Sequence, residues 1–227
     1  MHIVAPEDKS EQEKLLREKG LSFFGAIAAS VSHELNNVNS IIEQTAGLLG
    51  DLLAGAELGR PIKEEQLQRV RDRIEKQTHR GTRIIKRMNT FAHSVDYPIA
   101  EIEMNALIEN IISLCKRLAN LKKVELEAEM QSDPLSINSS PFLIQQALFL
   151  VMRNYFISDL AGETISVVLE PDKEGIVIII ETAAAEEVEI EDLDYIKLVL
   201  NQIQGNISNQ SNSEKTRIML KFPDLSH

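Results

Sequence analysis

The sequence predicts an α + (α+β) fold, in which a long helical hairpin forms a dimeric four-helix bundle and an α/β sandwich follows. Three observations support this fold. Apolar residues recur at steps of three and four through most of the first hundred residues, a segment with glycine and proline interrupts them, and β-rich runs alternate with helical patterns beyond Pro98. We therefore expect a helical domain over 1–97 and an α/β domain over 98–227.

The hairpin is predicted from two apolar stripes. The first helix covers roughly Glu11–Leu53, the turn lies in Ala54–Lys63, and the second helix repeats the stripe from Leu67 to Met88. The seam of the first helix contains Phe24, Ile27, Val31, Leu35, Val38, Ile42, Leu49 and Leu52. Two helices with one stripe each cannot close a core. We therefore expect a homodimer in which two hairpins form the bundle.

The second half shows helical and β-rich patterns in alternation. We predict helices over 104–121, 140–159 and 192–204, and strands over 124–130, 135–138, 164–170, 175–182, 206–209 and 216–222. The order αββαββαββ indicates a mixed sheet with helices on one face.

Composition narrows the class of protein. The chain has 227 residues, 43% of them hydrophobic, which is typical of a globular protein. A net charge of −11 argues against nucleic acid as a partner. The start is polar and no apolar run approaches the roughly 18–20 residues that span a bilayer, so we expect a cytoplasmic protein with no signal peptide and no membrane insertion. The single cysteine, Cys115, is expected in the core.

Charge is unevenly distributed along the chain. Residues 1–100 hold 14 acids and 14 bases, whereas residues 101–227 hold 21 acids and 10 bases and carry the whole net charge of −11. Within the neutral half, Arg60–Thr90 has ten bases and four acids. This segment is either a solvated helix face or a docking surface for an acidic protein.

The most informative histidine is His33. None of the five histidines has metal-ligand spacing, so no metal site is expected. His33 points away from the apolar seam, on a stripe of small uncharged polar residues made of Ser30, His33, Asn37, Ser40 and Gln44. An exposed imidazole there keeps a nucleophilic nitrogen, Glu34 is placed to orient it, and Asn37 is placed to position a water or a phosphoryl oxygen. The alternative is an ordinary surface histidine.

The segment Ser32–Asn37, SHELNN, resembles the H-box of sensor histidine kinases, inside their dimerisation and phosphotransfer hairpin. The resemblance implies that His33 is the phosphoacceptor and that Glu34 is its acidic neighbour. It also implies that Glu34 and Asn37 match the acid-x-x-Thr/Asn motif that this family uses for phosphatase activity. The proline often found a few residues later is absent, since Val38-Asn39 follows. The implied partner is a response-regulator receiver domain, and the residues expected to dock it are Ser30, Ser40, Gln44, Arg80 and Arg83.

The second half resembles the ATP-binding domain of the same kinases in its element order. Asn154 matches their magnesium-binding asparagine, Glu181 their adenine-binding aspartate and Thr216 a remnant of their final Gly-Thr motif. Other parts are missing: Leu150 replaces an asparagine, alanines follow Glu181 where glycines are needed, and the lid is reduced to a short segment rich in glutamate, with no Gly-x-Gly loop after it. We therefore expect no ATP binding and no cofactor, with magnesium supplied by the receiver.

Three functions remain open from the sequence. The first is a histidine phosphotransferase that moves a phosphoryl group between His33 and a receiver aspartate without its own ATP. The second is an ATP-dependent histidine kinase with an atypical nucleotide site. The third is a non-catalytic receiver-binding scaffold, or a phosphatase that uses Glu34 and Asn37. We favour the first, and we do not expect autokinase activity.

Overall fold

The structure is a computed structural model that describes residues 6–130, 133–158, 160–183, 188–210 and 215–226. It divides into two compact units. One unit comprises Ala28–Asn89, and the other joins the chain up to Ile27 with the chain from Thr90 onward. The domain boundary between residues 97 and 98 that the sequence suggested stays a prediction.

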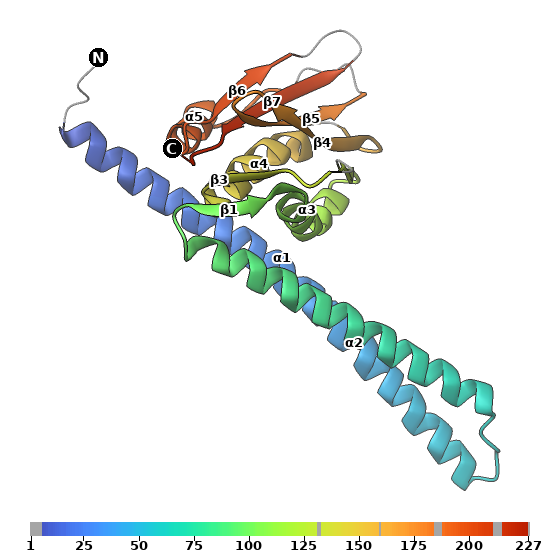
Figure 1. The fold of residues 1–227 in the computed structure, drawn as a ribbon. Helices are drawn as coiled ribbons and strands as arrows, with labels where there is room; N and C mark the ends of the chain where they lie inside the picture. The colour runs from blue at the N-terminus through green and yellow to red at the C-terminus, as the bar shows by residue number, and fades with distance from the viewer. Residues whose placement is uncertain (1–5, 131–132, 159, 184–187, 211–214, 227) are drawn as a thin grey trace. The chain divides into compact units, whose positions relative to one another are not determined.

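The first unit is the helical hairpin. Helix α1 spans Pro6–Glu57 and helix α2 spans Glu64–Ala92, so both predicted helices are confirmed, and α1 extends beyond its predicted ends (Figure 1). The turn between them places Gly59 at φ 81°, a conformation that favours glycine. Gly81 of α2 lies against α1, because a Cβ there would sit 3.4 Å from Val38 Cγ1. The two helices therefore pack closely at this level.

The second unit contains two sheets. Its strands are β1 (Ala100–Glu103), β2 (Glu125–Glu129), β3 (Ser136–Ser139), β4 (Thr164–Asp172), β5 (Gly175–Thr182), β6 (Asn206–Asn209) and β7 (Thr216–Pro223). The larger sheet has the order β2-β4-β5-β7-β6, with β2 and β4 parallel and the other pairs antiparallel. The mixed sheet is confirmed. Strand β1, which pairs with β3, was not predicted, because four residues show too little alternation.

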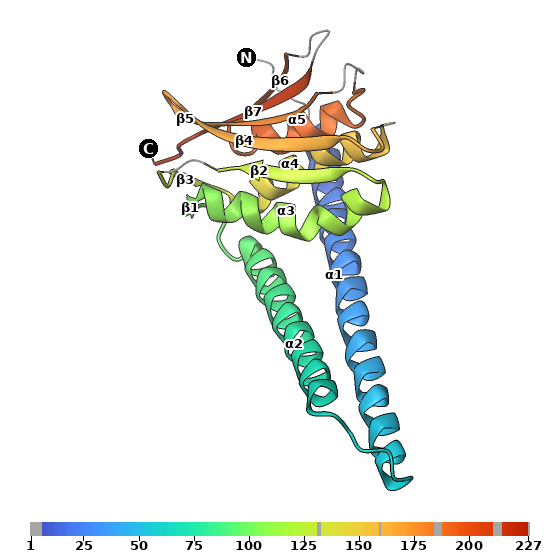
Figure 2. The same ribbon diagram turned by 90° about the vertical axis from the view of Figure 1, so that its right-hand side faces the viewer.

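Three helices cover one face of the larger sheet. They are α3 (Met104–Leu121), α4 (Pro141–Ile157) and α5 (Leu193–Asn201), and Figure 2 shows the sheet on one side of them. Ile176, Ile178 and Ile180 alternate along β5 toward the helices and are buried. Helix α4 is apolar around most of its circumference because it lies in the core of this unit. Cys115 of α3 is buried, as expected of a core residue.

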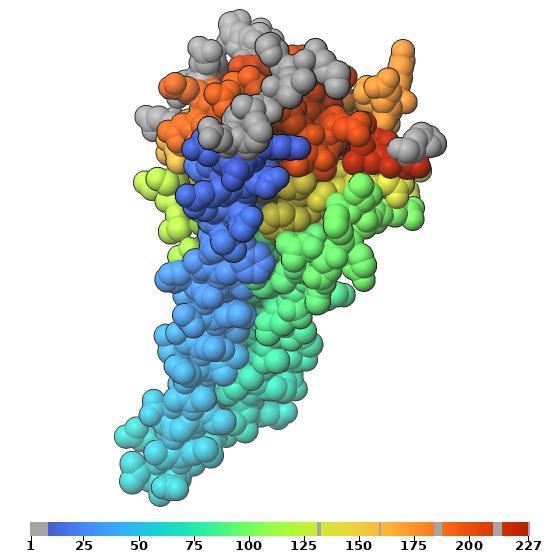
Figure 3. Space-filling view, turned by 90° about the vertical axis from the view of Figure 1, so that its left-hand side faces the viewer, coloured from blue at the N-terminus to red at the C-terminus, as the bar shows by residue number. Residues whose placement is uncertain are grey.

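The first turns of α1 belong to the core of this second unit, which the sequence did not predict. The ring of Phe23 lies 4.9 Å from that of Phe149, 5.3 Å from that of Phe91 and 5.5 Å from that of Phe142. Figure 3 shows this part of α1 against the surface of α5, where Lys19 reaches Asp192. The α/β unit therefore includes a helix that enters it from the beginning of the chain.

The observed architecture confirms a helical part followed by an α/β sheet domain with helices on one face. The four-helix dimer stays a prediction. Within the described ranges, no helix combines the length and the apolar character that a membrane span requires.

Candidate functional site

His33 is exposed on the part of α1 that forms the hairpin. Its neighbours Val31 and Val38 are buried against the hairpin interior. At about 100° per residue, His33 lies about 140° around the helix from Val38, so its ring points outward. The predicted orientation of His33 is confirmed. The imidazole is accessible to a partner molecule.

Three other members of the polar stripe, Asn37, Ser40 and Gln44, are exposed on the same helix. The placement of Ser30 on this exposed stripe is wrong: Ser30 is only 1% exposed. Ser30 lies about 80° from Val38, at the margin of the buried face of α1. Its hydroxyl has no hydrogen-bond partner among the described residues. Ser30 therefore cannot offer its side chain to a receiver in this structure.

Glu34 faces α2, where it forms an ion pair with Arg80. Oε2 of Glu34 lies 3.6 Å from Nη2 of Arg80, and the two side chains are 21% and 43% exposed. The sequence placed these residues in separate roles, Glu34 beside His33 and Arg80 on a docking surface. The structure brings them together across the hairpin. The ion pair that it gives for Glu34 is with Arg80 rather than with the imidazole.

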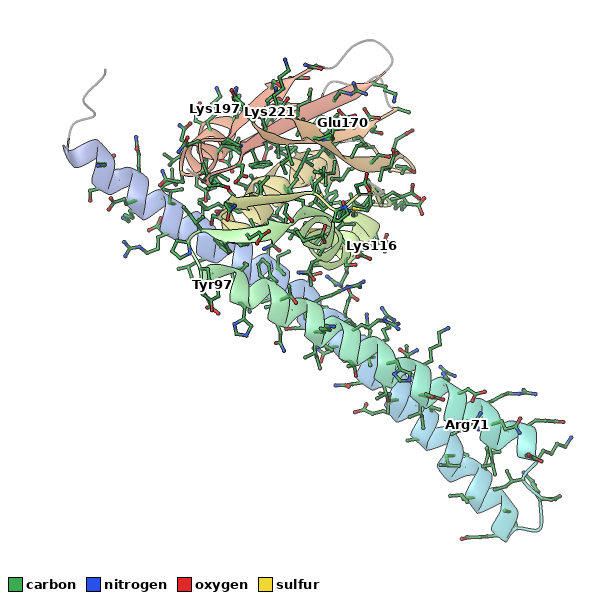
Figure 4. All side chains as sticks on the ribbon, viewed as in Figure 1. Arg71, Tyr97, Lys116, Glu170, Lys197 and Lys221 are labelled. Atoms are coloured by element: carbon green, nitrogen blue, oxygen red, sulfur yellow. The ribbon has the colours of Figure 1, made fainter. Side chains whose placement is uncertain are left out.

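Helix α2 presents many basic side chains to solvent. Arg83 is exposed, and so is Arg71, which Figure 4 labels and which donates hydrogen bonds to Asp72. This interaction raises the pKa of Arg71 above its usual range. The exposed positive charge suits a docking surface for an acidic protein, and that role stays a prediction.

Asn154, the residue that matches a magnesium ligand in the resemblance, is fully buried in α4. Its Nδ2 donates to the carbonyl oxygen of Leu150 over 2.8 Å, and its Oδ1 accepts from the backbone N–H of Glu191 over 2.8 Å. Both ends of the amide are thus committed to the protein itself. Leu150 is also buried. Asn154 connects α4 to the segment that precedes α5.

Glu181, at the end of β5, is paired with two bases on and before β7. Its Oε1 accepts from Nζ of Lys215 over 3.0 Å, and its Oε2 lies 2.6 Å from Nη2 of Arg217. Desolvation raises the pKa of this carboxyl, but the hydrogen bonds from Lys215 and Arg217 outweigh it and hold the pKa below its usual value. Thr216, between these two bases, is buried in the ladder opposite Thr182. The carboxylate of Glu181 is therefore engaged by two cations of the protein itself.

The N-terminus of α5 carries acids where a phosphate would be attracted to backbone N–H groups. Asp192 precedes the helix at φ 57°, and Asp194 lies in its first turn. Oδ2 of Asp192 lies 3.0 Å from Nζ of Lys19 and 3.1 Å from Nη2 of Arg153. The hydrogen bond from Lys19, despite partial desolvation, lowers the pKa of Asp192 below its usual value, so it is ionised at neutral pH. Asp192 is therefore the anionic partner of Lys19 and Arg153 at this end of the helix.

The glutamate-rich segment before α5 is only partly described. Glu186 and Glu187 lie outside the described residues, whereas Glu189 and Glu191 are exposed. In the described ranges, no group of three or more histidine, cysteine or acidic side chains is arranged to hold a metal ion. Sequence reasoning missed the contacts of Lys19 and Arg153 with Asp192. The one signal for these contacts in the sequence was an acidic residue, Asp192, just before a helix.

No family model matches the chain. A sequence relative is sporulation kinase A of Bacillus subtilis (strain 168), 22% identical over 171 residues, which cover 75% of this chain and 26% of the kinase. The chain thus spans about a quarter of the length of this curated relative. The similarity in sequence is therefore to part of a kinase.

Two solved structures of histidine kinases are similar to this chain. The histidine kinase AdeS of Acinetobacter baumannii has a TM-score of 0.49 at 14% identity, over 86% of this chain and 98% of that chain. The histidine kinase ThkA, in its complex with the response regulator protein TrrA, has a TM-score of 0.47 at 17% identity, over 98% of this chain and 68% of that chain.

Proposed function

We propose that this chain is a histidine phosphotransferase of two-component signal transduction, in which His33 exchanges a phosphoryl group with a receiver aspartate. The observation that carries the proposal is a contrast between two residues. His33 is exposed on the hairpin, whereas Asn154 is fully buried with both amide atoms hydrogen-bonded inside the protein. The phosphoacceptor is accessible and the nucleotide machinery is used for structure.

Two further features of the α/β unit support a chain that works without its own ATP. Glu181 is paired with Lys215 and Arg217, which leaves its carboxylate little capacity to hold an adenine. At the N-terminus of α5, Asp192 is already paired with Lys19 and Arg153, and Asp194 adds an acid in the first turn, so a nucleotide phosphate would have to compete with these carboxylates. The similarity to sporulation kinase A supports two-component signalling as the setting. In this proposal the receiver supplies the magnesium. The protein acts as a homodimer in the cytoplasm.

A second candidate is a phosphatase or receiver-binding module. The exposed amide of Asn37, one helical turn beyond His33, favours it, because an amide there can orient water toward a receiver's acyl phosphate. This activity needs no phosphohistidine. A kinase with an atypical nucleotide site is the third candidate.

The test uses the full chain and a panel of receiver domains, each labelled with acetyl [³²P]phosphate in the presence of Mg²⁺. We expect acid-labile label to appear on the wild type and on a His79→Ala variant, which removes another exposed histidine, but not on His33→Ala. In parallel, Mg²⁺ and [γ-³²P]ATP should give no label. His33-dependent label from ATP would establish the kinase instead. Receivers that lose phosphate equally fast with wild type and His33→Ala would favour the phosphatase.

A further inference from the structure

The contact between Glu34 and Arg80 lies beside a close approach of the two hairpin helices. Gly81, next to Arg80, is buried, and an added Cβ there would meet Val38 at 3.4 Å. This close packing fixes the backbone of α2 beside the turn of α1 that carries Glu34. Arg80 therefore reaches α1 from a well-defined position, although its side chain is 43% exposed.

The ion pair places the Arg80 guanidinium 3.6 Å from the carboxylate of Glu34, the residue that follows His33 on α1. Adjacent residues of a helix diverge by about 100°, so Glu34 lies between the face that packs on α2 and the outward direction of His33. A cation held by Glu34 lies at the same level of the helix as the imidazole. Both partners are partly exposed and the 3.6 Å separation is long for an ion pair, so it exchanges readily for a stronger anion.

We propose that Arg80 is a phosphoryl-binding residue, kept beside His33 by Glu34 until a phosphorylated receiver docks. This inference rests on the proposed phosphotransfer function. A phosphoryl group presents more negative charge than a carboxylate and accepts two parallel hydrogen bonds from a guanidinium. Arg80 then exchanges Glu34 for oxygens of the transferring group. The released Glu34 carboxylate becomes available to the ring of His33.

The transfer step balances without a further reactant. The lone pair of the unprotonated ring nitrogen of His33 forms a bond to phosphorus as the bond from phosphorus to the receiver aspartate breaks. The aspartate leaves as a carboxylate with that electron pair. The other ring nitrogen keeps its proton, and the positive charge on the phosphorylated ring faces the freed Glu34. Arg80 neutralises the charge on the phosphoryl oxygens during transfer.

The first experiment measures phosphoryl transfer from a labelled receiver at saturating concentration. We expect Arg80→Gln to slow transfer about 100-fold, because one charged donor to the transferring group is lost. Arg80→Lys should recover part of the rate, since lysine supplies charge without the planar fork. Arg73→Gln, which removes an exposed arginine two turns away on the same face of α2, should change the rate less than about threefold. Equal rates for Arg80→Gln and Arg73→Gln would overturn the inference.

A second measurement separates phosphoryl binding from docking. The affinity of Arg80→Gln for the unphosphorylated receiver should stay within about threefold of the wild type, because that receiver brings no phosphoryl group. If the variant instead raises KM and leaves the saturated rate unchanged, Arg80 is a docking residue and the inference fails.

A double variant separates direct contact from action through Glu34. If Arg80 touches the phosphoryl group, the losses from Glu34→Gln and Arg80→Gln combine in the double variant. A double variant no slower than Glu34→Gln alone would mean that Arg80 only positions Glu34, against the inference. A different result would contradict the proposed phosphotransfer function itself. In that case the wild type takes no label on His33 from any receiver.

Discussion

The clearest energetic prediction concerns Phe23, the residue that joins α1 to the α/β unit. Its side chain is only 2% exposed and its ring lies within 4.9–5.5 Å of the rings of Phe91, Phe142 and Phe149. These partners come from the end of α2 and from α4. Phe23→Ala therefore removes the centre of an aromatic cluster that connects three helices.

The magnitude follows from burial and ring contacts. Replacement of a fully buried phenylalanine by alanine costs about 3–5 kcal/mol, which combines lost transfer free energy with the cavity that remains. Aromatic pairs add about 0.5–1.5 kcal/mol beyond area burial. Since Phe23 has three ring partners, we expect a loss in the free energy of unfolding in the upper half of this range, about 4–5 kcal/mol.

Urea unfolding, followed by circular dichroism and by hydrogen exchange of α4, measures this loss. Leu21→Ala is the matched control, because Leu21 lies two residues earlier in the same helix and is 69% exposed. We expect the control to change the free energy of unfolding by less than about 0.5 kcal/mol. A loss below about 1.5 kcal/mol for Phe23→Ala, or unchanged protection of α4, would refute the conclusion that α1 contributes to the α/β core.

Two further predictions concern Asp192, which precedes α5, and Asn154, which the resemblance matched to a magnesium ligand. Because the folded-state pKa of Asp192 lies below its ordinary value of 3.8, its ionised form stabilises the protein above that pH, and this contribution is lost as pH falls through the folded pKa. Asp192→Asn should therefore lower the free energy of unfolding by about 1 kcal/mol at pH 7 and have little effect near pH 2, and an equal effect at both pH values would contradict the ion pairs. Asn154→Ala should cost about 2–3 kcal/mol in thermal unfolding because it leaves the Glu191 N–H without its acceptor and removes a second hydrogen bond to the Leu150 carbonyl, whereas Asn201→Ala, on α5, should cost less than about 1 kcal/mol.

The sequence by itself determined the helices and strands and the direction in which the side chain of His33 points. Helices and strands follow from local apolar periodicity, so α1, α2 and the strands of the larger sheet were all predicted near their observed bounds. His33 points outward because its angle from Val38 is fixed by the geometry of a single helix. Strand β1 was missed since its identity depends on pairing with β3 rather than on its own pattern.

Only the tertiary structure decided which residues meet across elements. Apolar periodicity identifies the buried face of a helix but does not show whether another element covers the edge of that face. The burial of Ser30, which follows the spacing of the polar stripe, could therefore not be predicted. The pairing of Glu34 with Arg80 and the partners of Asn154 likewise join residues that are distant in sequence or held by loops.

The position of Phe23 shows the same limit most clearly. Its apolar neighbours predict a helix, but its cluster includes rings more than a hundred residues away. Such contacts depend on how whole helices and strands pack together, and a local sequence pattern carries no information about them. The sequence thus predicted a phosphoacceptor on a hairpin. The structure showed that the α/β unit takes the first turns of that hairpin into its own core and uses Asn154 and Asp192 to hold itself together.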